Sequence, residues 1–231
     1  IGSTVYIESN VHVVLTDCKA SGSISNTRSN GAAGLSSRNS SNYTNSENCT
    51  IDLFGVTVSG TGRSVANYTG STVNLYNSTV SGTKYAIYNT GTVNTAGTVK
   101  TTSDTVESGY YCVYNFGTLT VDGTLTANGG DVGIYNAANK DGSQHGTMTV
   151  NGIVTSTGSS TGCSTGGVLA VTGTLTAIGK NLHGLYNNEH GTLTVNGTLT
   201  ATGNASSSKA NGLNNAGGTA TVIGTLTASG G

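Results

Sequence analysis

Apolar and polar residues alternate with a period of two in short runs along most of this 231-residue chain. In residues 117–136, Leu119 and Val121 alternate with threonines, and after a glycine a second run places Leu125 and Ala127 between threonines. Such alternation is typical of a half-buried β-strand. The two runs therefore predict two short strands joined by a sharp bend, and a third apolar run completes the unit with a third strand.

This unit returns as the phrase Gly-Thr-Leu-Thr-Val-x-Gly-Thr-Leu-Thr-Ala-x-Gly, in clear and degenerate copies. The nine copies begin at Gly2, Cys49, Gly70, Gly91, Gly117, Gly146, Gly167, Gly191 and Gly218. A phrase at such a period marks a solenoid, in which each copy buries its apolar face by stacking on its neighbours. The shortest copies have 21 residues. This length suits an all-β, right-handed parallel β-helix with three sheets and about nine turns, because the return path between parallel strands is right-handed.

The repeat runs from end to end, so we expect one domain over residues 1–231. Residues 1–48 carry long insertions and predict an irregular N-terminal turn or cap, whereas residues 49–231 carry the regular repeats. The inward strand positions predict an apolar core that includes Leu119, Val121, Leu125, Ile134, Leu175, Leu193, Val195, Leu199 and Val222.

One asparagine recurs at the end of the third strand of most copies. The column consists of Asn67, Asn89, Asn115, Asn136, Asn187 and Asn215. Asparagine tolerates the backbone conformations of bends and hydrogen-bonds to neighbouring groups, so stacked asparagines predict a structural role. Thr165 and Ser37 take this place in two copies and predict weak points.

Composition narrows the possible partners. Charged residues make up 8% of the chain and the net charge is −1, so there is no basic footprint for nucleic acid. No stretch approaches the roughly 20 apolar residues of a membrane helix. We expect no nucleic acid, no membrane span, no cofactor and no metal.

Four cysteines are few for a disulfide scaffold. Cys18 and Cys49 lie in the first two copies, where they could form a disulfide or remain free. Cys112 and Cys163 occupy positions two turns apart, too far for a disulfide at about 4.8 Å per turn. Cys163 stands where other copies have Ile134 and Leu185, so we expect it to be buried.

The segment Ala-Ile-Tyr-Asn-Thr-Gly-Thr-Val of residues 86–93 and the later Gly-Thr-Leu-Thr-Val-x-Gly phrases resemble a known group of microbial surface proteins. They are similar to right-handed β-helices with the pectin-lyase-like fold, namely adhesin-like proteins, polymorphic outer-membrane proteins and autotransporter passengers. The resemblance covers nearly all of residues 49–231. It implies an extracellular or cell-surface protein without enzymatic activity, acting as a surface rod, an adhesin segment or a filament subunit, with glycans or a host surface as possible partners.

A polysaccharide-binding or polysaccharide-cleaving protein is an alternative, since sugar hydrolysis requires paired carboxylates a few ångströms apart. The acidic residues are instead dispersed, at Asp52, Asp104, Glu107, Asp122, Asp131, Asp141 and Glu189. We therefore expect no catalytic residues and no enzyme.

Outward threonines on the second strand suggest another alternative, an ice-binding surface made of a Thr-x-Thr array. One predicted column contains Thr57, Thr79, Thr98, Thr124, Thr174, Thr198 and Thr225, and the column beside it contains Thr126, Thr176, Thr200 and Thr227. Lys100 and Ile153 interrupt the array, and threonine is also a good exposed strand residue whose neighbours stack well.

Tyr88, Tyr114, Tyr135 and Tyr186 share one outward position beside the asparagine column. An exposed aromatic row could bind sugar rings or a partner surface. Alternatively, the row could be a stacked column that stiffens the sheet.

The final copy follows the core pattern to its last strand. We expect Thr219–Ala228 to pair with further β-structure, either a second copy of this chain in a head-to-tail stack or a continuation of the same chain.

Overall fold

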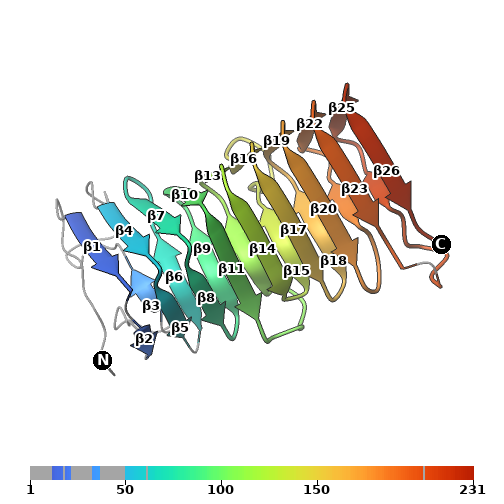
Figure 1. The fold of residues 1–231 in the computed structure, drawn as a ribbon. Helices are drawn as coiled ribbons and strands as arrows, with labels where there is room; N and C mark the ends of the chain where they lie inside the picture. Colours follow the sequence, from blue (N-terminus) through green and yellow to red (C-terminus); the bar gives the residue numbers. More distant parts are fainter. Residues whose placement is uncertain (1–11, 18, 22–32, 37–49, 61, 205) are drawn as a thin grey trace.

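The computed structural model describes residues 12–17, 19–21, 33–36, 50–60, 62–204 and 206–231. They form short strands joined by bends, without a helix. Figure 1 shows the strands stacked turn upon turn along one axis, with β1 and β26 at opposite ends of the stack.

The strands belong to three sheets. Sheet 1 contains β1 (His12–Thr16), β4 (Thr50–Phe54), β7 (Thr72–Tyr76), β10 (Thr92–Ala96), β13 (Thr118–Val121), β16 (Thr147–Val150), β19 (Val168–Val171), β22 (Thr192–Val195) and β25 (Thr219–Val222). Sheet 2 contains β2 (Lys19–Ser21), β5 (Thr57–Gly60), β8 (Thr79–Gly82), β11 (Thr98–Ser103), β14 (Thr124–Gly129), β17 (Ile153–Gly158), β20 (Thr174–Gly179), β23 (Thr198–Thr202) and β26 (Thr225–Ser229). Sheet 3 contains β3 (Ala33–Ser36), β6 (Arg63–Asn67), β9 (Tyr85–Asn89), β12 (Tyr111–Asn115), β15 (Val132–Asn136), β18 (Thr161–Thr165), β21 (Leu185–Asn187) and β24 (Leu213–Asn215).

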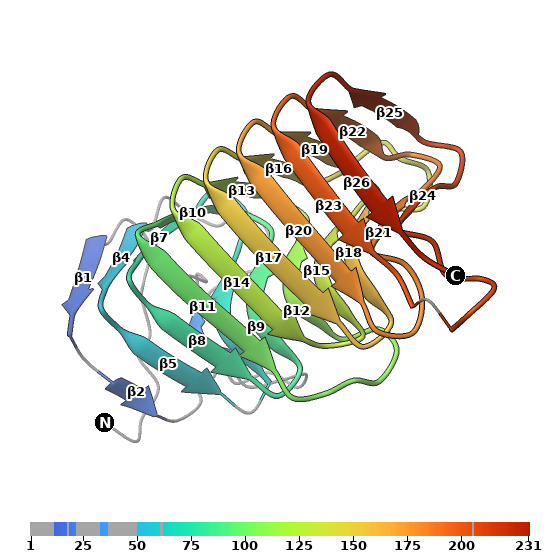
Figure 2. The same ribbon diagram turned by 45° about the vertical axis from the view of Figure 1, so that its right-hand side comes forward.

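Every strand pairs in parallel with the strand three places along the chain, so each turn of the coil contributes one strand to each sheet. In Figure 2 the strands of sheet 2 run downward in front while successive turns advance to the right, which makes the coil right-handed. The predicted three-sheet parallel β-helix is therefore confirmed.

The number of turns is smaller than expected. About seven turns are complete within the described residues, from β4–β6 to β22–β24. The expectation of nine turns counted every copy of the phrase. The first and the last copy do not form a complete turn within the described residues. The first copy runs through residues outside the described ranges, and the last contributes only β25 and β26.

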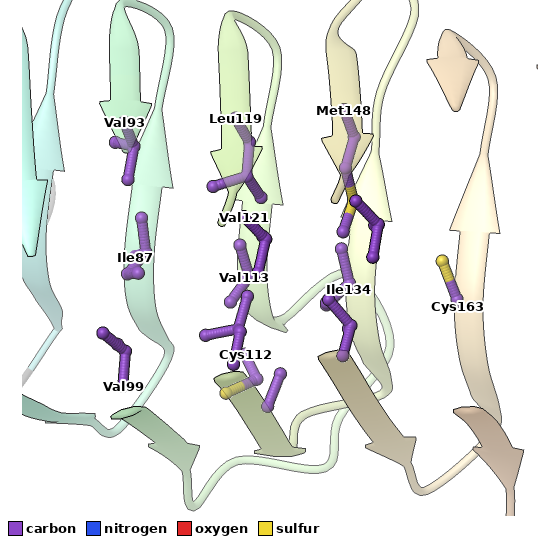
Figure 3. Packing of buried hydrophobic residues seen from close by; sticks show 14 of the residues in the cluster. Ile87, Val93, Val99, Cys112, Val113, Leu119, Val121, Ile134, Met148 and Cys163 are labelled. Atoms are coloured by element: carbon purple, nitrogen blue, oxygen red, sulfur yellow. The ribbon is translucent and has the colours of Figure 1, made fainter. Parts of the chain in front are cut away.

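One contiguous core fills the coil. Val93, Leu119 and Met148 occupy equivalent positions of sheet 1 in successive turns, and Ile87, Val113, Ile134 and Cys163 do so in sheet 3 (Figure 3). Of the predicted core residues, all but one are buried: Leu119, Val121, Leu125, Ile134, Leu175, Leu193, Val195 and Leu199. Val222 is the exception. It pairs with Val195 but is 38% exposed, because no described turn lies beyond β25.

The two described cysteines are free and fully buried, and burial raises the pKa of Cys112 and of Cys163 to about 12. Both are therefore protonated apolar residues of the core at neutral pH. Cys18 and Cys49 lie outside the described residues, so their pairing stays a prediction.

A glycine column lines the bend between sheets 1 and 2. A Cβ atom added to Gly173 would overlap the carbonyl oxygen of Gly152 one turn before, and one added to Gly197 would overlap that of Gly173. The recurring glycine of the phrase is therefore required by the close approach of successive bends.

Replacing Leu193 with aspartate should destabilise the fold by about 3–5 kcal/mol, because an unpaired charge would lie in the apolar core. Thr194→Asp, at the outward position next to it, is the matched control and should have a much smaller effect. Urea unfolding monitored by circular dichroism gives both free energies of unfolding. Equal losses for the two variants would contradict the inward assignment of Leu193.

Candidate functional site

The asparagine column is a buried ladder of hydrogen bonds along the edge of sheet 3. The Nδ2 atom of Asn67 donates to Oδ1 of Asn89 at 2.9 Å, Asn89 donates to Asn115 at 2.7 Å, and Asn115 donates to Asn136 at 2.8 Å. The same Nδ2 atoms also donate to the carbonyl oxygen of the first residue of a sheet 1 strand. Asn89, for example, donates to the Thr118 carbonyl at 2.8 Å. The ladder ties sheet 3 to sheet 1 at each of these turns.

The ladder is interrupted at Thr165. Asn136 donates to the Thr165 hydroxyl at 3.1 Å, and that hydroxyl donates its single proton to the carbonyl of Gly167 at 3.1 Å. The Thr165 hydroxyl therefore has no proton left to donate to Asn187 in the next turn. Oδ1 of Asn187 is buried without a hydrogen-bond partner. The ladder resumes from Asn187 to Asn215 at 2.6 Å. Ser37, the other expected weak point, lies outside the described residues.

The tyrosine row is continuous over three of its four members. The Tyr88 and Tyr114 rings stack at 4.9 Å with an interplanar angle of 6°, and Tyr135 follows at 5.9 Å and 58°. Ser164 takes the next position of the row and separates Tyr186 from the others. Tyr186 stacks instead on His183 at 5.5 Å.

Further tyrosines gather around this row and were not foreseen. Tyr85 meets Tyr88, Tyr110, Tyr111 and Tyr114 with centroid distances of 5.7 to 6.3 Å, all at steep angles. The signal was present in the sequence, because Tyr85 and Tyr111 each stand three residues before a member of the row. We call the resulting surface the tyrosine face; it comprises Tyr68, Tyr85, Tyr88, Tyr110, Tyr111, Tyr114 and Tyr135.

Two cations lie on the tyrosine face. The Arg63 guanidinium lies 3.7 Å from the centroid of the Tyr88 ring and donates a hydrogen bond to the Tyr68 hydroxyl at 3.3 Å. The Lys84 ammonium lies 4.9 Å from the Tyr110 centroid. Both distances are those of cation–π contacts.

Four hydroxyls of the tyrosine face have a raised pKa. The pKa of Tyr111 and of Tyr114 is raised to about 12, mainly by burial and in part by the neighbouring tyrosines. Burial also raises the pKa of Tyr85 and of Tyr135. These groups are therefore neutral hydrogen-bond donors at neutral pH.

The threonine columns of sheet 2 differ in register from the prediction. Thr79 pairs with Lys100, not with Thr98, so Thr57 and Thr79 belong to the second column. The expected single column through Thr57, Thr79 and Thr98 is therefore wrong. A shift by two residues keeps the same face of the strand inward, so the apolar pattern cannot reveal it.

Beyond this shift the array is regular over five turns. The first column reads Thr124, Ile153, Thr174, Thr198 and Thr225, and the second reads Thr126, Thr155, Thr176, Thr200 and Thr227. Ile153 is 52% exposed and is the one departure among these ten positions. These five strands contain no charged residue.

Two of the described acidic groups, Asp122 and Asp52, pair with polar neighbours. Asp122 accepts a hydrogen bond from Asn151 at 2.8 Å, and Asp52 accepts one from Asn74 at 2.6 Å and contacts His12 at 2.7 Å. Within the described residues, no group of three or more His, Cys, Asp or Glu side chains could hold a metal ion. The same residues include no helix long and apolar enough to cross a membrane.

The fold places the chain in the class of parallel β-helix repeat proteins. No family model matches it, and no match was found among curated proteins or solved structures. The adhesin-like and autotransporter resemblance therefore remains a hypothesis.

Replacing Thr165 with asparagine should restore the ladder, because a second amide can donate to Oδ1 of Asn187 while it accepts from Asn136. An unpaired buried acceptor costs about 1–3 kcal/mol, so we expect a gain of that order in the free energy of unfolding. Ser164→Asn adds the same group one residue away, where it cannot reach Asn187, and should give no gain. Urea unfolding compares the variants; a loss of stability in Thr165→Asn would refute the role assigned to the unpaired rung.

Proposed function

We propose that this chain is a non-enzymatic extracellular protein, a rigid surface rod that acts as an adhesin segment or a filament subunit. The observation that carries the proposal is the unbroken stack of parallel turns around one core, tied along one edge by the asparagine ladder. Such a coil supplies length and stiffness, and each turn presents its outward side chains at a fixed spacing.

The surface chemistry supports a role without catalysis. Hydrolysis of glycosidic bonds needs two carboxyl groups across one sugar, about 5–9.5 Å apart. Asp122 and Asp52, by contrast, are each hydrogen-bonded to an asparagine of the adjacent turn. Low charge and outward threonines suit a structural surface exposed to water.

An edge of the coil supports the stacking part of the proposal. Strands β25 and β26 are exposed throughout, and Ile223 and Leu226 are 77% and 40% exposed. Open strand edges accept further strands. In our proposal a further β-turn covers this edge, supplied by a second copy of the chain or by more of the same chain.

Ice binding is a second candidate, and the regular part of the threonine array favours it. Nine of ten outward positions over five turns are threonine, in register and without charge. Hydroxyl and methyl groups repeated at the spacing of paired strands, about 4.8 Å, can order water on a flat surface. Sheet 1 carries similar threonines, including Thr192 and Thr194, so the candidate requires sheet 2 to be the active face.

Immunogold electron microscopy of intact source cells tests the surface rod. Antibodies raised against the purified chain should label the outside of unpermeabilised cells, in lines along filaments if copies stack end to end and at separate points if they do not. Labelling that appears only after permeabilisation would refute the extracellular role.

Thermal hysteresis of the purified chain tests ice binding. If sheet 2 binds ice, the protein should show hysteresis, and Thr198→Tyr should abolish it because the bulky ring breaks the flat array. Thr194→Tyr, on sheet 1, is the matched control and should keep the activity. Wild-type protein without hysteresis, or equal loss in both variants, would eliminate this candidate.

A further inference from the structure

Arg63 and Lys84 form no ion pair within the described residues. The described ion pairs join His12 to Asp52 and His190 to Glu189, and neither includes these two cations. Both cations nevertheless lie on the same surface, held by tyrosine rings at 3.7 and 4.9 Å. Within the described residues, the two positive charges of the tyrosine face are therefore not paired with a carboxylate.

Arg63 is held in place by its neighbours. Ala66 takes the position of the row one turn before Tyr88, and its side chain is too small to cover the Tyr88 ring. The Arg63 guanidinium covers that ring instead. One hydrogen bond goes to the Tyr68 hydroxyl. A guanidinium has five N–H donors in a planar fork, so donors remain for a carboxylate. Because the group is already oriented, binding an anion costs little additional side-chain entropy.

Tyrosine hydroxyl groups recur along the tyrosine face beside the cations. Tyr88 and Tyr114 stack in register on successive turns, so their hydroxyl groups recur along the rod axis at about the spacing of paired strands, 4.8 Å. Among the described residues, the acidic group that raises the pKa of a face tyrosine is Asp131, which acts on Tyr111 and whose backbone N–H donates to the Tyr110 carbonyl at 2.8 Å. The positive charge of the face lies over the Tyr88 ring at Arg63 and over the Tyr110 ring at Lys84.

We propose that the tyrosine face binds an acidic polysaccharide, with a sugar carboxylate at Arg63 and Lys84 and sugar hydroxyls at the tyrosine hydroxyls. The proposal rests on the adhesive form of the proposed function and names its ligand class. The periodic donors favour a repeating polymer, and the two cations, which form no ion pair within the described residues, favour one that carries carboxylates. The aromatic faces stack on one another, so the polymer contacts ring edges and hydroxyl groups.

Binding of the full chain to immobilised hyaluronan and alginate, with dextran as the neutral polymer, tests the proposal. We expect binding to the two acidic polymers, weakened by added salt, and little binding to dextran. Arg63→Gln should lower the affinity for the acidic polymers at least about tenfold, since a charged hydrogen bond is lost. Lys84→Gln should lower it as well, and Lys84 is exposed, so this second variant keeps the test valid if Arg63→Gln affects folding.

Lys100→Gln is the matched control, because it removes the same charge from sheet 2. It should leave the affinity unchanged. Tyr114→Phe keeps the stacked ring but removes a hydroxyl, and it should weaken binding less than Arg63→Gln. Equal binding to dextran, or equal effects of Lys84→Gln and Lys100→Gln, would overturn the proposal. The absence of binding to all three polymers would also overturn it, and this is the result expected if the face contacts a protein. Surface labelling of intact cells tests the rod function independently of this result.

Discussion

Successive turns of the coil are joined by parallel backbone hydrogen bonds, which hold each strand about 4.8 Å from the next. In this structure the pairing is in register over long stretches, so a residue lies directly on its counterpart in the neighbouring turn. Every side chain must therefore pack against, or hydrogen-bond with, a residue of the same position. The core, the ladder, the tyrosine stack and the threonine columns all follow from this constraint.

The asparagine ladder shows which polar side chain satisfies the constraint inside the coil. An amide carries both donors and an acceptor, so identical amides can stack without leaving a group unpaired. A hydroxyl has one proton, and Thr165 donates it within its own turn, to Gly167. The unpaired Oδ1 of Asn187 is the consequence one turn later. Replacing an amide by a hydroxyl at one position thus breaks the column.

Much of the fold followed from the sequence, since period-two runs and recurring glycines define strands and bends. Leu193 and Val195 could be placed inside because their neighbours Thr192 and Thr194 had to face out. The shift in register between β8 and β11 could not be foreseen. Thr79 pairs with Lys100 and not with Thr98, and either pairing keeps the same side chains inward. For the surfaces, repetition identified the tyrosine row. It did not identify Arg63, which contributes through cation–π contacts with Tyr85 and Tyr88 at the start of that row.

The same constraint explains why charge is sparse. Like charges at one position would lie about 4.8 Å apart along a whole column and repel one another. The described strands avoid this: Lys100 lies between Thr79 and Thr126, and Asp52 beside Asn74. Arg63 pairs with Tyr85 and covers Tyr88. A charge in such a coil is therefore placed where its neighbours are neutral, and its counter-ion need not come from the chain. Departures from repetition, more than the repeat itself, are where a β-helix of this kind can acquire specific recognition.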